Sequence, residues 1–237
     1  MKKLSYLFLM FLISGCTPES EFEKYKKHVV TLASDEFEGR APGTAGGEKT
    51  KNYIASHFES LGLKSFGGSY LMPVNLTGIN LIVDESFFNL SVNGEMLDLN
   101  YRTDVVYGTT RQIEEVAFDD SDLIFVGYGV NAPEYDWNDY KVDVTGKTVV
   151  MLINDPGFEL KGTEFNGKAM TYYGRWTYKF EEAARQGAAG VLIIHETAPA
   201  SYPWGVVENG WSGEQLNLTF ADRNLDRSAL ELSLIHI

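Results

Sequence analysis

Two stretches near the start of the chain have the apolar spacing of amphipathic helices. Apolar residues recur there at steps of three and four, which places them on one helix face. They are Phe22, Tyr25, Val29 and Leu32 in the first stretch, and Tyr53, Ile54, Phe58 and Leu61 in the second. Between them, residues 38–47 contain four glycines and a proline, which break the helical period. We expect two helices with one buried face each, joined by a loop, the second capped by Gly62.

The next part of the chain has the pattern of short strands. Residues 70–78 and 80–94 resemble strands, and Asn93-Gly94 is a typical hairpin dipeptide. Residues 122–130 and 146–155 carry nearly continuous apolar runs that are too short for buried helices. Both runs therefore predict buried strands.

A helix and a strand follow in immediate succession. The expected inner face of the helix consists of Trp176, Phe180, Ala183 and Ala184. Gly187 should end the helix, and residues 190–194 should form the next strand. A helix between two buried strands indicates a β-α-β crossover on a sheet. The predicted fold class is α/β, with an N-terminal helical segment followed by a β-rich α/β domain.

The first sixteen residues have the layout of a secretory signal rather than of a folded segment. Lys2 and Lys3 precede an apolar run over residues 4–13, which is too short to span a bilayer as a stable helix. Ser14-Gly15-Cys16 then resembles the lipidation site of bacterial lipoproteins. The alternative is that Cys16, the only cysteine, is a free thiol that acts as a small hydrophobe. We expect lipidation of Cys16, a membrane anchor through that lipid, and a location in the cell envelope.

Composition narrows the possible partners. The formal net charge is −13, and it becomes −15 once the signal and its two lysines are removed. A strongly acidic protein is a poor match for nucleic acid and for adsorption to anionic lipid by charge. The content of 44% hydrophobic and 13% aromatic residues is sufficient for a folded core.

The histidines do not form a recognisable metal-binding motif. His57 and Glu59 stand two apart on a predicted helix, so both side chains cannot face one ion. His195-Glu196 lacks the second histidine of a His-Glu-x-x-His site, and Pro199 interrupts the helix that such a site needs. For these histidines, and for His28 and His236, a surface or core role is expected.

Other catalytic patterns are also missing from the sequence. The segment Gly210-Trp211-Ser212-Gly213 has its second glycine one place too early for a serine nucleophile turn. The acidic groups at 114–115 and 119–122 lack the spacing of a calcium loop and are expected to be solvated. We therefore predict no catalytic residue and no metal ligand from the residues themselves.

Two stretches nevertheless resemble parts of a known enzyme family. Residues 32–64, with Arg40, Gly43 and Thr44 in an Arg-x-x-Gly-Thr loop, resemble the opening of co-catalytic zinc aminopeptidases. Residues 125–159, continued by 181–196, resemble the protease-associated domain inserted into bacterial secreted members of that family. The two stretches occur in the order that the family has.

The resemblance implies an exopeptidase that acts on peptides with two zinc ions. In the family, the zinc ligands and the glutamate base follow the inserted domain, so none of those roles transfers to a residue of this chain. Glu114-Glu115 lies inside the insert and is not the family's Glu-Glu pair. We therefore expect zinc in the intact protein, with no catalytic site and no zinc site in the present chain.

The same resemblance suggests domain limits and an incomplete C-terminus. The expected divisions are a signal at 1–16, a tether and first peptidase segment at 17–80, the protease-associated domain at 81–231, and a foreign tail at 232–237. The tail Leu-Ser-Leu-Ile-His-Ile is a frame translation of a transposase adapter used in sequencing libraries. On that interpretation, its strand-like pattern would have no structural meaning.

Two alternatives stay open. The chain could be a complete, lipid-anchored module that binds peptides or glycans without catalysis. Within the enzyme class, a carboxypeptidase or an amidohydrolase fits these residues as well as an aminopeptidase does.

Overall fold

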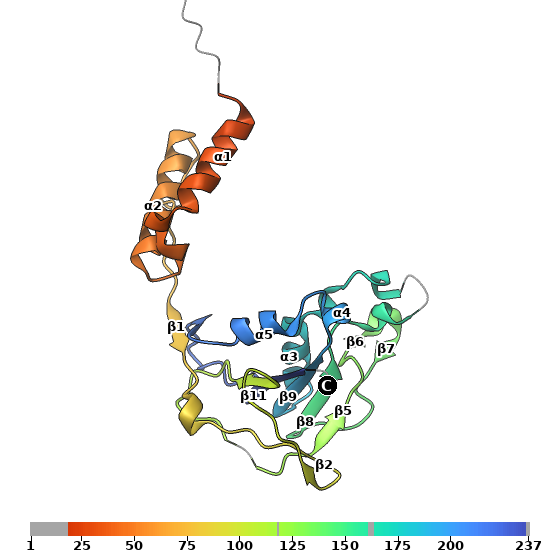
Figure 1. Ribbon diagram of the computed structural model, residues 1–237. Coiled ribbons are helices and arrows are strands. Elements are labelled where there is room, and N and C mark those ends of the chain that lie inside the picture. The colour runs from red at the N-terminus through yellow and green to blue at the C-terminus, as the bar shows by residue number, and fades with distance from the viewer. Residues whose placement is uncertain (1–18, 118, 161–163, 236–237) are drawn as a thin grey trace, which may run out of the picture. The chain divides into compact units, whose positions relative to one another are not determined.

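The computed structural model describes residues 19–117, 119–160 and 164–235, which divide into two compact units. The division falls between Pro73 and Val74, with a helical unit before it and a sheet unit after it (Figure 1). Strand β1 (Leu76–Ile79) pairs with β10 (Gln215–Leu218), which joins residues 76–79 to the second unit. The domain limits that the resemblance suggests stay a prediction.

The helical unit consists of α1 (Glu21–Leu32), the 3-10 helix η1 (Asp35–Arg40) and α2 (Ala45–Ser60). Gly62 caps the C-terminus of α2 as predicted, and its φ of +67° is readily adopted by glycine. The amide of Gly62 donates to the carbonyl of Glu59, and the amide of Leu63 donates to the carbonyl of Phe58. These two bonds form a Schellman cap, which satisfies carbonyls at the helix end.

The prediction of a buried face on α1 is wrong for the described residues. Phe22 and Tyr25 are both 68% exposed, and α1 contributes no buried side chain within the part of the chain that the structure describes. On α2, Ile54 and Phe58 are also exposed. Two helices and one short turn offer too little surface to cover an apolar face on each helix.

The sheet unit is built on a mixed five-stranded sheet (Figure 1). The strand order is β4 (Val105–Gly108), β11 (Leu230–Ile235), β9 (Gly190–His195), β8 (Thr148–Leu152) and β5 (Leu123–Phe125). Strands β5, β8, β9 and β11 are parallel, and β4 is antiparallel to β11. The predicted β-α-β crossover is confirmed, because α3 (Trp176–Arg185) connects the paired parallel strands β8 and β9.

Both faces of the sheet are covered. Val191 and Ile193 of β9 lie in one core cluster with Phe180 and Ala183 of α3. Leu192 lies on the other face, in a second cluster that includes Leu90 from the segment before β4. Alternation along β9 thus supplies two cores, as expected for an internal parallel strand.

Small elements complete the sheet unit. The remaining two-stranded ribbons are β2 (Ser91–Val92) with β3 (Glu95–Met96), and β6 (Asn131–Ala132) with β7 (Trp137–Asn138). The remaining helices are η2 (Val83–Glu85), η3 (Pro133–Tyr135), η4 (Pro156–Phe158), η5 (Glu164–Asn166), η6 (Tyr172–Gly174), α4 (Thr197–Ala200) and α5 (Trp204–Gly210). The Asn93-Gly94 hairpin is confirmed, with both residues at positive φ between β2 and β3.

Three predicted strands are shorter than expected. In 70–78 and 80–94, regular pairing is limited to β1 and β2, and η2 interrupts the second segment. In 122–130, only Leu123–Phe125 is a strand, because Gly127 and Gly129 take positive φ and turn the chain. Glycine has no Cβ to oppose that conformation.

Residues 230–235, which include most of the expected tail, form a strand inside the sheet. Strand β11 pairs with β9 on one side and β4 on the other, and the side chains of Leu232 and Ser233 are fully buried. The interpretation that the pattern of this segment has no structural meaning is therefore wrong as far as residue 235. The alternating leucines suit a strand with one apolar core face, whatever the origin of the hexapeptide.

Leu232→Ala should destabilise the sheet unit strongly. Leu232 is 0% exposed within the second core cluster, and truncation of a buried leucine costs about 2–5 kcal/mol. Urea unfolding followed by tryptophan fluorescence measures the loss. Leu225→Ala is the matched control, since Leu225 is 49% exposed in the same unit and should change stability by less than about 0.5 kcal/mol. Equal losses in the two variants would contradict a core position for β11.

Candidate functional site

The Arg-x-x-Gly-Thr loop joins the helices of the helical unit. The guanidinium of Arg40 donates to the carbonyl of Leu32 at the end of α1, where positive charge is favoured. Gly43 has a φ of +76°, and the hydroxyl of Thr44 accepts from the amide of Gly47, 3.1 Å away, as the N-cap of α2. All three motif residues therefore fix the path of the chain between the helices.

A glycine lets η1 approach the start of α2. A Cβ on Gly46 would lie 2.0 Å from the carbonyl oxygen of Phe37, so no larger residue fits without movement of the backbone. Phe37 is buried and contacts the ring of Tyr53 edge-on. The loop thereby sets the position of Tyr53 on α2.

The structure brings two of the predicted non-ligand histidines together. His28 of α1 and His57 of α2 lie with ring centroids 4.4 Å apart, and the Tyr53 hydroxyl is 2.7 Å from Nδ1 of His28. These rings adjoin a hollow of about 750 Å³ in the helical unit. The sequence did not predict this contact. The two rings belong to different helices, and the apolar pattern of each helix does not determine how one helix is rotated relative to the other.

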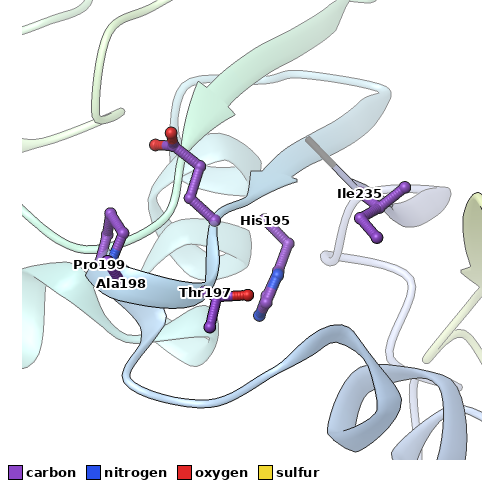
Figure 2. Close-up of a pocket in the computed structure, with 6 residues that line it drawn as sticks. His195, Thr197, Ala198, Pro199 and Ile235 are labelled. Atoms are coloured by element: carbon purple, nitrogen blue, oxygen red, sulfur yellow. The ribbon is translucent and has the colours of Figure 1, made fainter. Parts of the chain in front are cut away.

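His195 occupies a different environment, at the carboxyl end of β9 (Figure 2). Its side chain is 1% exposed and is surrounded by the rings of Trp176, Tyr202 and Trp204, at 5.3 to 6.5 Å between centroids. Burial lowers its pKa, which favours the neutral imidazole. Nε2 has no hydrogen-bond partner among the described residues.

A hollow of about 300 Å³ opens beside this histidine. His195, Glu196, Thr197, Ala198, Pro199 and Ile235 line it. It lies beyond the carboxyl end of a parallel strand, which is where open α/β sheets commonly bind ligands. One histidine and one glutamate beside this hollow do not make a catalytic set.

A buried lysine lies on the face of α3 that covers the sheet. Lys179 is 0% exposed, and its Nζ donates to the carbonyl of Tyr128 at 2.6 Å. Burial lowers the pKa of Lys179 to about 7, opposed by the charges of Asp139 and Asp155. The apolar pattern of this helix had pointed to Ala184 for the inner face, but that residue is only partly buried.

The two aspartates near Lys179 are held by backbone amides. Asp139 accepts from the amides of Tyr128 and Val130, and from the indole of Trp137. Asp155 accepts from the amides of Gly157 and Thr171 and from the Thr171 hydroxyl. Both carboxylates therefore order the loops at the ends of β5 and β8, and neither is free to act as a general base.

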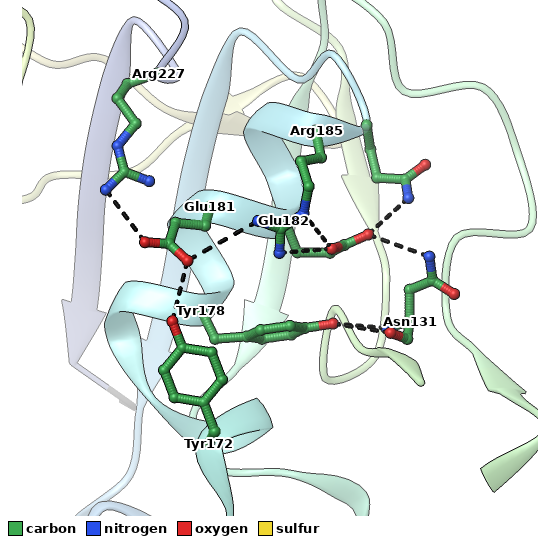
Figure 3. Close-up of polar contacts among 8 residues, drawn as sticks. Asn131, Tyr172, Tyr178, Glu181, Glu182, Arg185 and Arg227 are labelled. Carbon is green, nitrogen blue, oxygen red and sulfur yellow. Dashed lines mark hydrogen bonds and ion pairs between the residues drawn. The ribbon is translucent and has the colours of Figure 1, made fainter. Parts of the chain in front are cut away.

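A second polar network connects α3 to the elements beside it (Figure 3). Glu182 accepts from Asn131, Arg185 and Gln186. Glu181 accepts from the hydroxyl of Tyr172 at 3.0 Å and forms an ion pair with Arg227 at 3.5 Å. These contacts tie α3 to β6, to η6 and to the segment before β11, so their role is structural.

Among the described residues, no group of three or more histidine, cysteine, aspartate or glutamate side chains is arranged to hold a metal ion. Cys16 lies outside the described residues, and its lipidation stays a prediction. None of the helices in the described ranges is both long enough and apolar enough to cross a membrane.

Comparison with known proteins gives only weak structural likeness. No family model and no curated protein matches the chain. Two solved structures of a zinc aminopeptidase from Bacillus subtilis are similar to it, both with a TM-score of 0.29. The first is 21% identical over 71% of this chain, and the second is 17% identical over 88%. The chain spans only 32% and 43% of the lengths of those structures.

Thr44→Ala should loosen the first turn of α2. Loss of an N-cap hydroxyl costs about 1 kcal/mol, or roughly a fivefold change in a local opening equilibrium. Amide hydrogen exchange at Gly47 and Glu48 measures the effect. Thr44→Ser keeps the hydroxyl and should keep the protection. Equal exchange in all three proteins would exclude the capping role.

Lys179 and Glu231 should make the stability of the sheet unit depend on pH in opposite directions. Burial raises the pKa of Glu231, on β11, to about 7, despite a hydrogen bond from Thr110. Lys179 is charged in the unfolded chain up to its ordinary pKa of 10.5 but loses its proton near pH 7 when folded, so its contribution to stability rises from pH 7 toward 10.5. Glu231 keeps its proton to about pH 7 when folded, so its contribution falls between pH 4.5 and 7.

Variants separate these two contributions. Lys179→Met should remove a positive slope of at most about 1.4 kcal/mol per pH unit between pH 7.5 and 9.5. Glu231→Gln should remove a negative slope of the same size between pH 5 and 6.5. Differences between wild-type and variant unfolding free energies, measured with urea at each pH, test both slopes. Parallel curves would show that the two groups titrate normally in the folded protein.

Proposed function

We propose that this chain is the N-terminal portion of a zinc-dependent aminopeptidase of the cell envelope, anchored through lipid on Cys16. The sheet unit corresponds in this proposal to a protease-associated domain inserted into the peptidase. The substrate of the intact protein is a peptide with a free N-terminus. The acidic charge of the chain makes nucleic acid an unsuitable partner.

One observation carries the proposal. The two family-like stretches lie in separate folding units, in the family's chain order, and each forms the local structure that its motif suggests. Arg40, Gly43 and Thr44 form the connection between α1 and α2, and the joint after α3 leads into β9, the central strand of the sheet. A helical segment before an inserted sheet unit is the arrangement that the resemblance implies.

Within this proposal the described residues support the enzyme rather than perform hydrolysis. Zinc in the intact protein would activate water and polarise the scissile carbonyl. The residues of the helical unit would hold the first loop in place, and the sheet unit would fold around its own core. Neither unit contributes a side chain that we assign to proton transfer.

A binding module is the second candidate. The sheet unit has its own cores, and a hollow lined by His195, Glu196 and Thr197 lies at the carboxyl end of β9. A lipid-anchored protein could bind a peptide or a glycan there without catalysis. The exposed apolar residues of α1 and α2 weigh against this candidate, because they suit a larger domain.

The source DNA beyond the codon for Glu231 tests the proposal directly. We expect it to encode a His-x-Asp sequence and then a Glu-Glu pair. The longer protein should hydrolyse an aminoacyl reporter, lose activity with a chelator and regain it with Zn²⁺. A reporter with an acetylated N-terminus should resist hydrolysis, which separates an aminopeptidase from a carboxypeptidase or an amidohydrolase.

The 237-residue chain is the matched control and should release no product. Chelator-sensitive hydrolysis by that chain alone, free of contaminating proteases, would overturn the proposal. A downstream sequence without the expected ligands would overturn it as well, in favour of the binding module.

A further inference from the structure

The strongest unassigned chemistry in the described residues is the pair of imidazoles between α1 and α2. His28 and His57 are partly buried, with ring centroids 4.4 Å apart and ring planes at 61°. Neutral imidazole is the commonest metal ligand in proteins.

The surroundings of His28 favour one ring nitrogen for binding. Nδ1 lies 2.7 Å from the hydroxyl of Tyr53, so that nitrogen already has an oxygen partner and the ring orientation is fixed. When Nδ1 donates to this oxygen, Nε2 carries the free lone pair. An oxygen that holds the other nitrogen is the usual support for a metal-bound histidine. Tyr53 is held in turn by its contact with buried Phe37.

The hollow beside the pair has room for an ion and its water ligands. His28, His57 and Tyr53 line it, together with the oxygen-bearing side chains of Asn52 and Ser56. Since the described side chains form no group of three metal-binding residues, two imidazoles would be the protein ligands and water would complete the shell.

Lysines also line the hollow, and two of them form ion pairs with glutamates. Lys24 forms an ion pair with Glu21 at 2.7 Å, and Lys49 forms one with Glu36 at 3.6 Å. Lys27 adds one further positive charge. A hollow lined by lysines could instead attract an anion. The close contact of two imidazoles, one of them oriented by a hydroxyl, favours the cation.

We propose that His28 and His57 form a two-histidine site for a divalent transition-metal cation of the Zn²⁺, Ni²⁺ or Cu²⁺ class, with Tyr53 as a positioning residue. The site links α1 to α2. Binding therefore stabilises the helical unit, in which α1 lacks a buried face of its own. This inference does not depend on the aminopeptidase proposal, since it uses only residues of the first two helices.

Titration of the full chain with Cu²⁺, in the absence of a histidine tag, tests the site. We expect one bound Cu²⁺ whose electron paramagnetic resonance spectrum shows coupling to two imidazole nitrogens. His28→Gln and His57→Gln should each reduce the coupling to one nitrogen. Loss of a residue that only hydrogen-bonds to a metal ligand weakens metal binding about 10–100-fold, and loss of a ligand itself should weaken Cu²⁺ binding at least as much.

Two more variants separate ligation from folding and from charge. Tyr53→Phe keeps both imidazoles and should weaken binding about tenfold, with two-nitrogen coupling retained. Lys24→Gln changes the charge of the same hollow and should leave affinity equal or higher. Circular dichroism confirms that each variant keeps its helices, and calorimetry with Zn²⁺ repeats the affinity comparison.

The double variant His28→Gln/His57→Gln supplies the background from the chain termini and from His195 and His236. Equal Cu²⁺ binding by this variant and the wild type would overturn the proposal. Shifts in the amide resonances of α1 and α2 on addition of inorganic phosphate, with none caused by Zn²⁺, would also overturn it and identify an anion site.

Discussion

The sheet unit depends on burying β9 on both faces. Its residues alternate between two cores, so a stable sheet requires cover on each side. Helix α3 supplies one cover because it crosses between β8 and β9. The irregular segment around Leu90 and Tyr101 supplies the other. The hydrogen bonds and ion pairs of α3 and of the loops at the strand ends keep these two covering segments packed on the sheet.

Buried polar groups serve that arrangement. Lys179 reaches from α3 to the carbonyl of Tyr128, and Asp139 and Asp155 satisfy the amides of the loops at the strand ends. Burial of such groups is unfavourable unless each finds a partner, so a satisfied set restricts how the helix and loops can be placed. Among the described residues of this unit, the buried hydroxyl of Tyr140 and the buried Nε2 of His195 have no hydrogen-bond partner.

The sequence pattern predicted those parts of the fold that depend on residues close together in the chain. The continuous apolar runs around β8 and β9, the Asn93-Gly94 turn and the glycine cap of α2 all depend on neighbours in the sequence. The burial of Lys179 could not be predicted, because a lysine in a helix ordinarily faces water. The contact of His28 with His57 and the place of β11 both depend on distant segments, about which periodicity carries no information.

The pairing of β4 with β11 has a consequence for the order of folding. Val105 emerges early in synthesis, yet its partner Leu234 lies near the opposite end of the sheet unit. Loop closure over such a separation is slow, so β4 waits with an unpaired edge while the chain between is completed. Until β11 is added, the open edge of β4 can pair with a strand of another chain, so the unfinished sheet unit needs protection from aggregation.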